Sequence, residues 1–315
     1  MTMATGSNAR VAYIEEVTPG TTPATPAFNE FPINDFSLQL TKDVFTDASI
    51  YKDRQTHFLK HGNKKVGGDI SVTLLGAGAN PTGNTLYDKW LESLFNSTWT
   101  SNVLKVGNTN KSFTFEKTIT DTAGTSNYFR FKGVQVTALS FDVALNAPVK
   151  AKFSVLGLDA ETIATTAIAG ATYVPQPSAP SPLVHTNSNN VFKEGGTATA
   201  LMTAFQLTIN NGSDSNFALG SPVAQSITSS RAQVTGSATY YFSDATMMNK
   251  FINETNSSLE VKLSDGTRSY DFLLPNVVYS AATQTIQNEN TLIVTMPFTA
   301  VFDSTSGTTV QITRA

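Results

Sequence analysis

The chain of 315 residues is long enough for one large or two ordinary domains, and its 40% of apolar residues can fill a core, which excludes wholesale disorder. Charged residues make up only 14%, against roughly 25% in typical soluble domains, and the net charge of −3 excludes a global basic field that would recruit DNA or an anionic membrane. The sequence holds no cysteine, which excludes disulfides, thiolate metal sites and cysteine nucleophiles. No apolar run is long enough for a transmembrane helix, and residues 1–10 predict no secretory signal.

Alternation of apolar and polar residues predicts that strands dominate the first half of the chain. A polar loop is expected at 45–66. A helix is expected at 86–95, with Thr85 as its cap, Asp88 completing a capping box, and an apolar stripe that we interpret as core packing. The predicted strands cover 36–40, 66–75, 113–119, 128–136, 138–145 and 149–156.

Residues 162–200 are predicted to form a linker rich in proline, threonine and alanine. Four prolines between residues 175 and 182 cannot continue a helix, so this stretch should run as an extended, polyproline-like chain. The linker would separate a first domain at 1–161 from a second domain at 201–315.

The second half is also predicted to consist mainly of strands, with a polar loop at 211–233 and a helix at 244–254 capped by Ser243. The expected apolar face of this helix consists of Met247, Met248, Phe251 and Ile252. The predicted strands cover 205–209, 234–242, 259–263, 269–274, 277–283 and 291–301.

The clearest hairpin of the sequence joins 259–263 to 270–274 through Asp265 and Gly266. An Asp-Gly pair favours a type I′ turn, in which both central residues have positive φ.

The two halves share one order of elements, which predicts a duplicated domain. Each has a strand, a polar loop of about 20 residues, a strand that opens with a valine and a glycine, a helix and four further strands. Val66 and Val234 mark the equivalent strand openings. Unstructured loops of such length are uncommon and often functional.

Charge divides unequally between the halves. Residues 1–160 carry a net charge of +1 and residues 161–315 a net charge of −4. The first polar loop is either a solvated loop or a contact loop that meets an acidic surface on a neighbour. Its charged and ionisable residues are Lys52, Asp53, Arg54, Lys60, His61, Lys64 and Lys65.

No motif supports catalysis. Residues 76–81 resemble a dinucleotide-binding turn, but a proline stands at the third glycine position. His57 and His61 are four residues apart and lack a third metal ligand with suitable spacing. Glu15 and Glu16 are adjacent, so on a strand they point to opposite faces. Because no nucleophile elbow or P-loop is present either, we predict no catalytic residue, no cofactor and no metal site.

Short motifs of the second half, in their order along the chain, resemble those of phage tail tube proteins, the major tail proteins of long-tailed bacteriophages with non-contractile tails. They are LTINN at 207–211, LGS at 219–221, VTG at 234–236, FLLP at 272–275 and FTA at 298–300. The stretch YIEEVTPGTTP at 13–23 is similar to the family's opening. The first half departs from the pattern at 66–68, where VGG replaces VTG.

The resemblance implies a mainly β fold of two tandem β-sandwich or barrel-like tail tube domains, each with one flanking α-helix. Subunits would close a ring by joining their sheets, and stacked rings would form a tube in the virion, assembled in the bacterial cytoplasm. The implied partners are further copies of the chain, a tape measure protein, and tail tip and terminator proteins, while DNA passes through without specific binding.

The resemblance also implies that extended loops bridge one ring to the next. The residues expected at these inter-ring contacts are Lys52, Asp53, Arg54, Lys60, Lys64, Lys65, Asp214, Phe217 and Arg231.

A duplicated domain predicts the symmetry of the ring. If six domains build one ring, a chain with two of them should form a trimer with approximate six-fold symmetry. A second hypothesis, from another class, is a carbohydrate-binding or adhesin-like β-sandwich module in which an exposed aromatic residue such as Trp99 stacks on sugars. An enzyme on a β-scaffold has no motif in its favour.

Overall fold

The computed structural model describes residues 3–76, 87–176, 181–199, 201–284 and 291–315, and within them strands dominate, which confirms the mainly β prediction. Twenty strands belong to one continuous sheet, and two form a separate hairpin. The helices are α1 (Asp88–Phe95) and α2 (Thr246–Ile252). The strands of the first half are β1 (Ala4–Glu15), β2 (Ala27–Glu30), β3 (Asp35–Phe36), β4 (Gln39–Thr46), β5 (Leu59–Thr73), β6 (Val103–Lys105), β7 (Phe113–Asp121), β8 (Ser126–Ala144), β9 (Lys150–Gly157) and β10 (Asp159–Ala160). The later strands are β11 (Thr172–Val174), β12 (Val191–Glu194), β13 (Thr197–Ala198), β14 (Met202–Asn210), β15 (Asp214–Asn216), β16 (Ser226–Thr228), β17 (Gln233–Tyr241), β18 (Ser257–Ser264), β19 (Ser269–Tyr279), β20 (Thr283–Gln284), β21 (Ile293–Ala300) and β22 (Gln311–Arg314).

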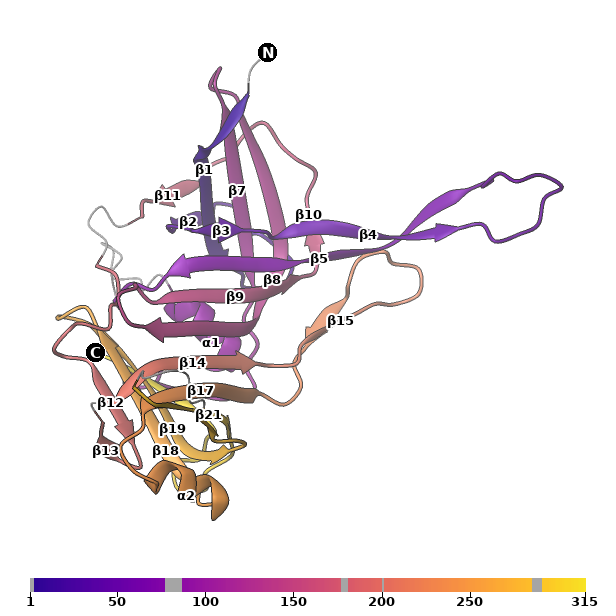
Figure 1. The fold of residues 1–315 in the computed structure, drawn as a ribbon. Helices are drawn as coiled ribbons and strands as arrows, with labels where there is room; N and C mark the ends of the chain where they lie inside the picture. The colour runs from indigo at the N-terminus through magenta and orange to yellow at the C-terminus, as the bar shows by residue number, and fades with distance from the viewer. Residues whose placement is uncertain (1–2, 77–86, 177–180, 200, 285–290) are drawn as a thin grey trace.

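The central part of the sheet, which we call the wall, is an antiparallel row in the order β4–β5–β9–β8–β14–β17–β21 (Figure 1). Beyond β21 the row ends with the last residues of β19 and with β20, which both pair with β21. The wall is open, because β4 lies at one end and β20 at the other, and the described residues form no closed barrel within one chain. The first and second halves meet inside the wall, where β8 pairs with β14.

Strand β8 joins the wall to a second layer of strands. Its first part pairs with β7, which pairs with β1, and its later part pairs with β14. The strands predicted separately at 128–136 and 138–145 are therefore one strand. The reason for this error is a β-bulge between Val136 and Ala138, which shifts the alternation by one residue and so mimics an interruption in the sequence.

Two β-bulges occur at matching places in the two halves. The pairing of β7 with β8 shifts register between Phe113 and Phe115, and that of β18 with β19 shifts between Ser257 and Leu259. A second bulge, in β8 against β9, also has a counterpart. From Tyr279 opposite Phe298 to Thr283 opposite Thr295, the chain between β19 and β20 advances by four residues while β21 advances by three. Since a bulge is a specific local insertion, two matching bulges indicate that the halves share backbone geometry as well as element order.

Two glycines also occupy matching places. A Cβ atom on Gly68 of β5 would lie 2.6 Å from the carbonyl oxygen of Ser37, and one on Gly236 of β17 would overlap the carbonyl oxygen of Gln206. Both glycines therefore allow the neighbouring strand to approach closely.

The core lies on one side of the wall, beneath α1. One row of buried side chains runs across five strands of the wall: Ile70, Phe153, Leu139, Ile209 and Val234. Trp90 of α1 is fully buried and contacts Phe153 edge-on. The apolar stripe predicted for the first helix is therefore core packing, as expected.

The predicted caps of the helices are wrong where they can be described. Thr85 lies outside the described residues. The N-cap position of α1 is Tyr87, whose side chain makes no capping hydrogen bond. Asp88 is the first residue of α1 rather than its third, and its carboxylate accepts a hydrogen bond from Tyr270. At α2 the cap position is Ala245 rather than Ser243. Here the free N–H of Thr246 donates to Asp244 Oδ1 at 2.7 Å, so an adjacent carboxylate takes over the role predicted for the serine.

The second helix does not bury the predicted apolar face. Ile252 is 65% exposed, while Met247 and Phe251 are half-buried. The side of α2 that faces the protein carries Lys250, whose ammonium binds the carboxylate of Glu194. The helix is therefore held partly by a polar contact.

The predicted hairpin at 259–274 forms from β18 and β19, but its turn differs from the prediction. Ser264 pairs with Ser269, which leaves a four-residue loop, and of the two expected residues only Gly266 has positive φ, at 102°. The carboxylate of Asp265 accepts hydrogen bonds from the N–H groups of Thr267 and Arg268, so the side chain replaces the type I′ geometry.

Residues 162–200 supply strands to both halves. Strand β11 pairs in parallel with β2, and β12 pairs with β18. Tyr173 of β11 stacks on Phe28 and donates a hydrogen bond to buried Glu116 at 2.7 Å. Residues 177–180 of the predicted polyproline-like stretch lie outside the described residues, and Leu183 just beyond them is fully buried.

Candidate interaction surfaces

The predicted loop at 45–66 belongs to a two-stranded arm that projects from the wall (Figure 1). Strands β4 and β5 stay paired as far as Thr46 opposite Leu59, so only residues 47–58 form a loop. The loop prediction was right for residues 47–58 and wrong for the strand residues 45–46 and 59–66, because both faces of the arm meet solvent. Neither face therefore needs the alternation of apolar residues by which strands are found in a sequence.

The end of the arm is ordered by its own side chains. Asp47 accepts a hydrogen bond from the N–H of Ser49, which lowers the pKa of that carboxyl. Asp53 binds His57 at 3.0 Å, and the rings of Tyr51 and His57 lie 3.8 Å apart.

The predicted inter-ring residues of the first half divide into two groups. The side chains of Lys52, Arg54 and Lys60 are exposed on the outer arm, together with Asp53. Near its base, Lys65 pairs with Asp43 at 2.8 Å and Lys64 with Asp159 at 3.5 Å. The N–H of Lys64 also donates to the carbonyl of Pro222, so the base of the arm is bound to the second half.

The arm also carries exposed apolar side chains that the sequence prediction missed. Ile50 is fully exposed, and Phe45 is 61% exposed. A cluster of exposed apolar side chains on a projecting element is typical of a contact surface. The signal was present in the sequence, within a segment that we interpreted only by its charges. The exposed apolar residues of the arm are Val44, Phe45, Ile50, Tyr51, Phe58 and Leu59.

The predicted residues of the second loop lie apart from one another. Strands β15 and β16 form a short hairpin on the same side of the wall as the arm (Figure 1). Asp214 is exposed on this hairpin, whereas Phe217 packs against a small buried cluster that includes Leu158 and Ile227. Arg231 lies at the other end of the loop and lines a cavity with Asn96.

The face of the wall opposite α1, which we call the open face, is polar and nearly neutral. One row of side chains crosses six paired strands and contains a single charge, on Lys152, which an ion pair with Asp69 balances. In the next row Lys150 stands opposite Asp142. The first row consists of Ser71, Lys152, Ser140, Thr208, Thr235 and Thr299.

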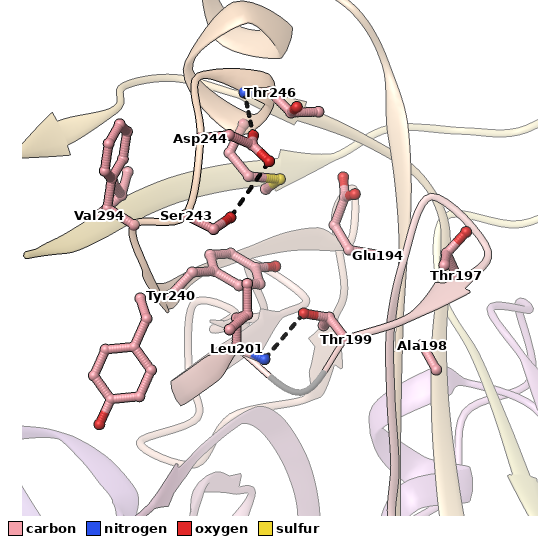
Figure 2. Close-up of a pocket in the computed structure, with 13 residues that line it drawn as sticks. Glu194, Thr197, Ala198, Thr199, Leu201, Tyr240, Ser243, Asp244, Thr246 and Val294 are labelled. Carbon is pink, nitrogen blue, oxygen red and sulfur yellow. Dashed lines mark hydrogen bonds between the residues drawn. The ribbon is translucent and has the colours of Figure 1, made fainter.

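A cavity of about 330 Å³ lies beside α2, and the buried carboxylate that lines it is already bound (Figure 2). The carboxylate of Glu194 accepts hydrogen bonds from Lys250, Ser257 and Tyr279. Burial raises the pKa of Tyr240 above the ordinary range, so its phenol stays neutral. The cavity therefore offers neither a free carboxylate pair nor an activated nucleophile.

The other groups considered for chemistry have structural contacts in the described residues. Glu15 pairs with Lys89 and Lys111, while Glu16 is buried and accepts hydrogen bonds from Ser112 and Thr114, so the two carboxylates point apart as predicted. The described residues contain no group of three side chains that could hold a metal ion. Residues 77–81 of the glycine-containing turn lie outside the description. None of the described helices is long and apolar enough to cross a membrane.

Trp99 is not available as a platform for sugars. Its indole N–H donates to the carbonyl of Asp88, and the guanidinium of Arg314 lies over its ring, 4.6 Å from the centroid. This aromatic residue therefore fixes the C-terminal strand against α1.

Comparison with known proteins gives one result. No curated protein matches the chain. The family described as phage tail tube protein matches residues 6–300, which include most of both halves, the arm and the whole wall. The chain therefore belongs to the phage tail tube protein family and has a structural role in the tail of a virion.

Proposed function

We propose that the protein forms stacked rings of three chains, each ring with approximate six-fold symmetry, and that these rings build a conduit for DNA around a tape measure protein. Each chain contributes two domains, 1–161 and 201–315, joined by residues 162–200. Assembly takes place in the bacterial cytoplasm and involves tail tip and terminator proteins at the two ends of the tube.

The observation that carries this proposal is the pair of matching β-bulges in the two halves. A repeat that preserves bulges provides two building units with the same strand pairing in one chain. If six such units close a ring, three chains suffice, because contacts repeated around an axis generate a closed ring.

The composition of the open face supports passage of DNA without binding. Each lysine or arginine that neutralises a phosphate adds affinity, which would slow a moving duplex. The open face presents mainly serine and threonine, and its charges occur in lysine–aspartate pairs. We therefore place this face toward the lumen.

The arm supports ring stacking. It projects from the wall and combines apolar side chains with Lys52, Arg54 and Lys60. The net charge of −4 on the second half gives these cations a complementary surface on the adjacent ring. Asp53, Lys64, Lys65, Asp214, Phe217 and Arg231 complete the proposed contact region.

Electron cryo-microscopy of the purified protein tests the proposal. Hollow tubes with three chains in each ring are expected, while six chains in each ring would contradict the symmetry. Monodisperse monomers that bind glycans would contradict the tube and favour the carbohydrate-binding alternative. A strongly basic lumen would contradict the orientation of the wall.

A further inference from the structure

The joint between the two halves inside one chain is a complete strand pairing. Residues 138–144 of β8 pair antiparallel with residues 204–210 of β14, over seven residue pairs without a register shift. Phe141 stands opposite Leu207 on the core side, and Ser140 stands opposite Thr208 on the open face. The joint therefore makes both the core and the open face continuous across the two halves.

Each partner in this joint has an equivalent at an end of the wall. Leu40 of β4 pairs with Val66, as Ile209 of β14 pairs with Val234, so β4 is the equivalent of β14. Residues 277–284, which comprise the end of β19 and all of β20, are the equivalent of the later part of β8. Both segments contain one extra residue relative to the strand they pair with, which is β21 in one case and β9 in the other. Among the described residues, the outer edges of β4 and of β20 pair with no other strand.

These two edges carry neither a charged residue nor a proline over the residues that would pair. Charged residues and prolines on an edge strand hinder its pairing with other chains. Residues 37–41 read Ser-Leu-Gln-Leu-Thr and residues 281–284 read Ala-Ala-Thr-Gln, with no charge and no proline. Charges begin only at Lys42, where the arm leaves the wall. Both edges are therefore suited to pairing.

We propose that the β20 edge of one chain pairs antiparallel with the β4 edge of a second copy in the same register as the internal joint, which places Thr283 opposite Gln39. This inference rests on the proposed function and specifies its ring contact. The core-side pairs are then Leu38 with Gln284 and Leu40 with Ala282.

The register follows from the pairings already described. Val66 stands opposite Gly157, and Val234 stands opposite Ala300. Lys152 lies five residues before Gly157 on β9, and Thr295 lies five residues before Ala300 on β21. Lys152 pairs with Ser140, and Thr295 pairs with Thr283. Thr283 is therefore the equivalent of Ser140.

The same comparison fixes the other strand of the joint. Gln39 precedes Leu40 as Thr208 precedes Ile209, so Gln39 is the equivalent of Thr208. Ser140 stands opposite Thr208 inside the chain, and the copied joint therefore sets Thr283 opposite Gln39.

The faces of the proposed joint agree. Gln39 and Thr283 are both exposed, and both belong to the open face. Leu40 and Ala282 both contact the core. A register shifted by one residue would instead set core-side against open-face side chains, which the alternation of a strand forbids.

Cysteine cross-linking tests this register without background, since the chain has no cysteine. The variant with Gln39→Cys and Thr283→Cys should form disulfides between chains in assembled tubes, because directly opposite residues have Cα atoms about 5 Å apart. A matched positive control carries Ser140→Cys and Thr208→Cys and should form the same bond within one chain. A matched negative control pairs Gln39→Cys with Ala281→Cys, which lies two residues off register.

On a non-reducing gel, the first variant should give bands of two or more linked chains, at least several-fold stronger than those of the negative control. The positive control should run as a single chain that carries an internal disulfide. Tubes that form with no preference for the Gln39–Thr283 pair would overturn this inference while leaving the proposed tube intact. Dimers from the single Gln39→Cys variant would show that two β4 edges pair with each other, which also contradicts it. Failure to form tubes under reducing conditions would instead count against the proposed function.

Discussion

Tyr270 of β19 donates a hydrogen bond of 2.5 Å to the carboxylate of Asp88, the first residue of α1. Both residues are buried, and Arg314 of the C-terminal strand pairs with the same carboxylate. Burial, together with the charge of Asp88, raises the pKa of Tyr270 well above its ordinary value, so the phenol remains a donor. The second half of the chain is thereby bound to the helix of the first half.

Replacing Tyr270 with Phe should lower the free energy of unfolding by about 1–3 kcal/mol, because a buried carboxylate loses one of its donors. Urea unfolding followed by tryptophan fluorescence measures the change. Tyr241→Phe is a matched control, since Tyr241 is 42% exposed. An equal loss in both variants would show that the Asp88 contact contributes nothing.

Adding one methyl group at either matching glycine should destabilise the protein. Gly236→Ala places a Cβ against the carbonyl oxygen of Gln206 and 2.6 Å from the ring of Phe298, and Gly68→Ala places one 2.6 Å from the carbonyl oxygen of Ser37. We expect losses of about 1–3 kcal/mol, the typical cost of overpacking. Thermal unfolding of both variants measures them.

Gly6→Ala serves as the control for these variants, because a Cβ there meets no atom within 4 Å. It should change stability by less than about 0.5 kcal/mol. Tolerance of alanine at Gly68 or Gly236 would contradict the close approach of the strands.

Glu92 of α1 should make the protein more stable at neutral than at acidic pH. Burial alone would raise the pKa of its carboxyl, but hydrogen bonds from Lys111, the N–H of Trp99 and Lys89 outweigh burial and lower the pKa below its ordinary value of 4.5. A lowered folded-state pKa gives stability that is fully present above the unfolded value and is lost as pH falls through the folded value.

The comparison of wild type with Glu92→Gln measures this contribution. The difference in melting temperature should be largest near pH 7 and shrink steadily below about pH 4.5. The exposed Glu254→Gln variant should show a smaller difference at every pH. A wild-type advantage that grows in acid would contradict the assignment.

Ile50→Asp should impair ring stacking without impairing folding. Ile50 is fully exposed at the end of the arm, so its replacement should change stability by less than about 0.5 kcal/mol. Burying a new carboxylate between rings should shorten the tubes seen by electron microscopy or abolish them. Val17→Asp is the control, because Val17 is 96% exposed and lies outside the arm. Normal tubes from Ile50→Asp would contradict a contact at this residue.

Segments with one buried face were predictable from the sequence. The strands at 259–263 and 270–274 were found because Leu259, Val261 and Leu263 alternate with solvent-facing residues. The stripe of α1 was found for the same reason, since the core covers it. In the arm, both faces of the strands meet solvent, so the sequence has no alternation that marks a strand. Under α2, Lys250 replaces apolar packing, so an apolar stripe does not mark the side of the helix that faces the protein.

The two edges of the wall could not be found from the sequence. Leu40 of edge strand β4 and Ile209 of joined strand β14 both face the core, so their local patterns are alike. Which strands lack a neighbour depends on pairings between residues far apart in the chain, and those emerge only from the folded structure.

The pairing of β8 with β14 has a thermodynamic consequence because both strands belong to one chain. An intramolecular joint forms at a fixed effective concentration and loses no translational freedom between molecules, so dilution does not open it. A joint between two copies responds to protein concentration. In a ring of three chains, every second joint lies between two copies, and only these joints would open on dilution. Disassembly would therefore release single chains, each with its two domains still joined.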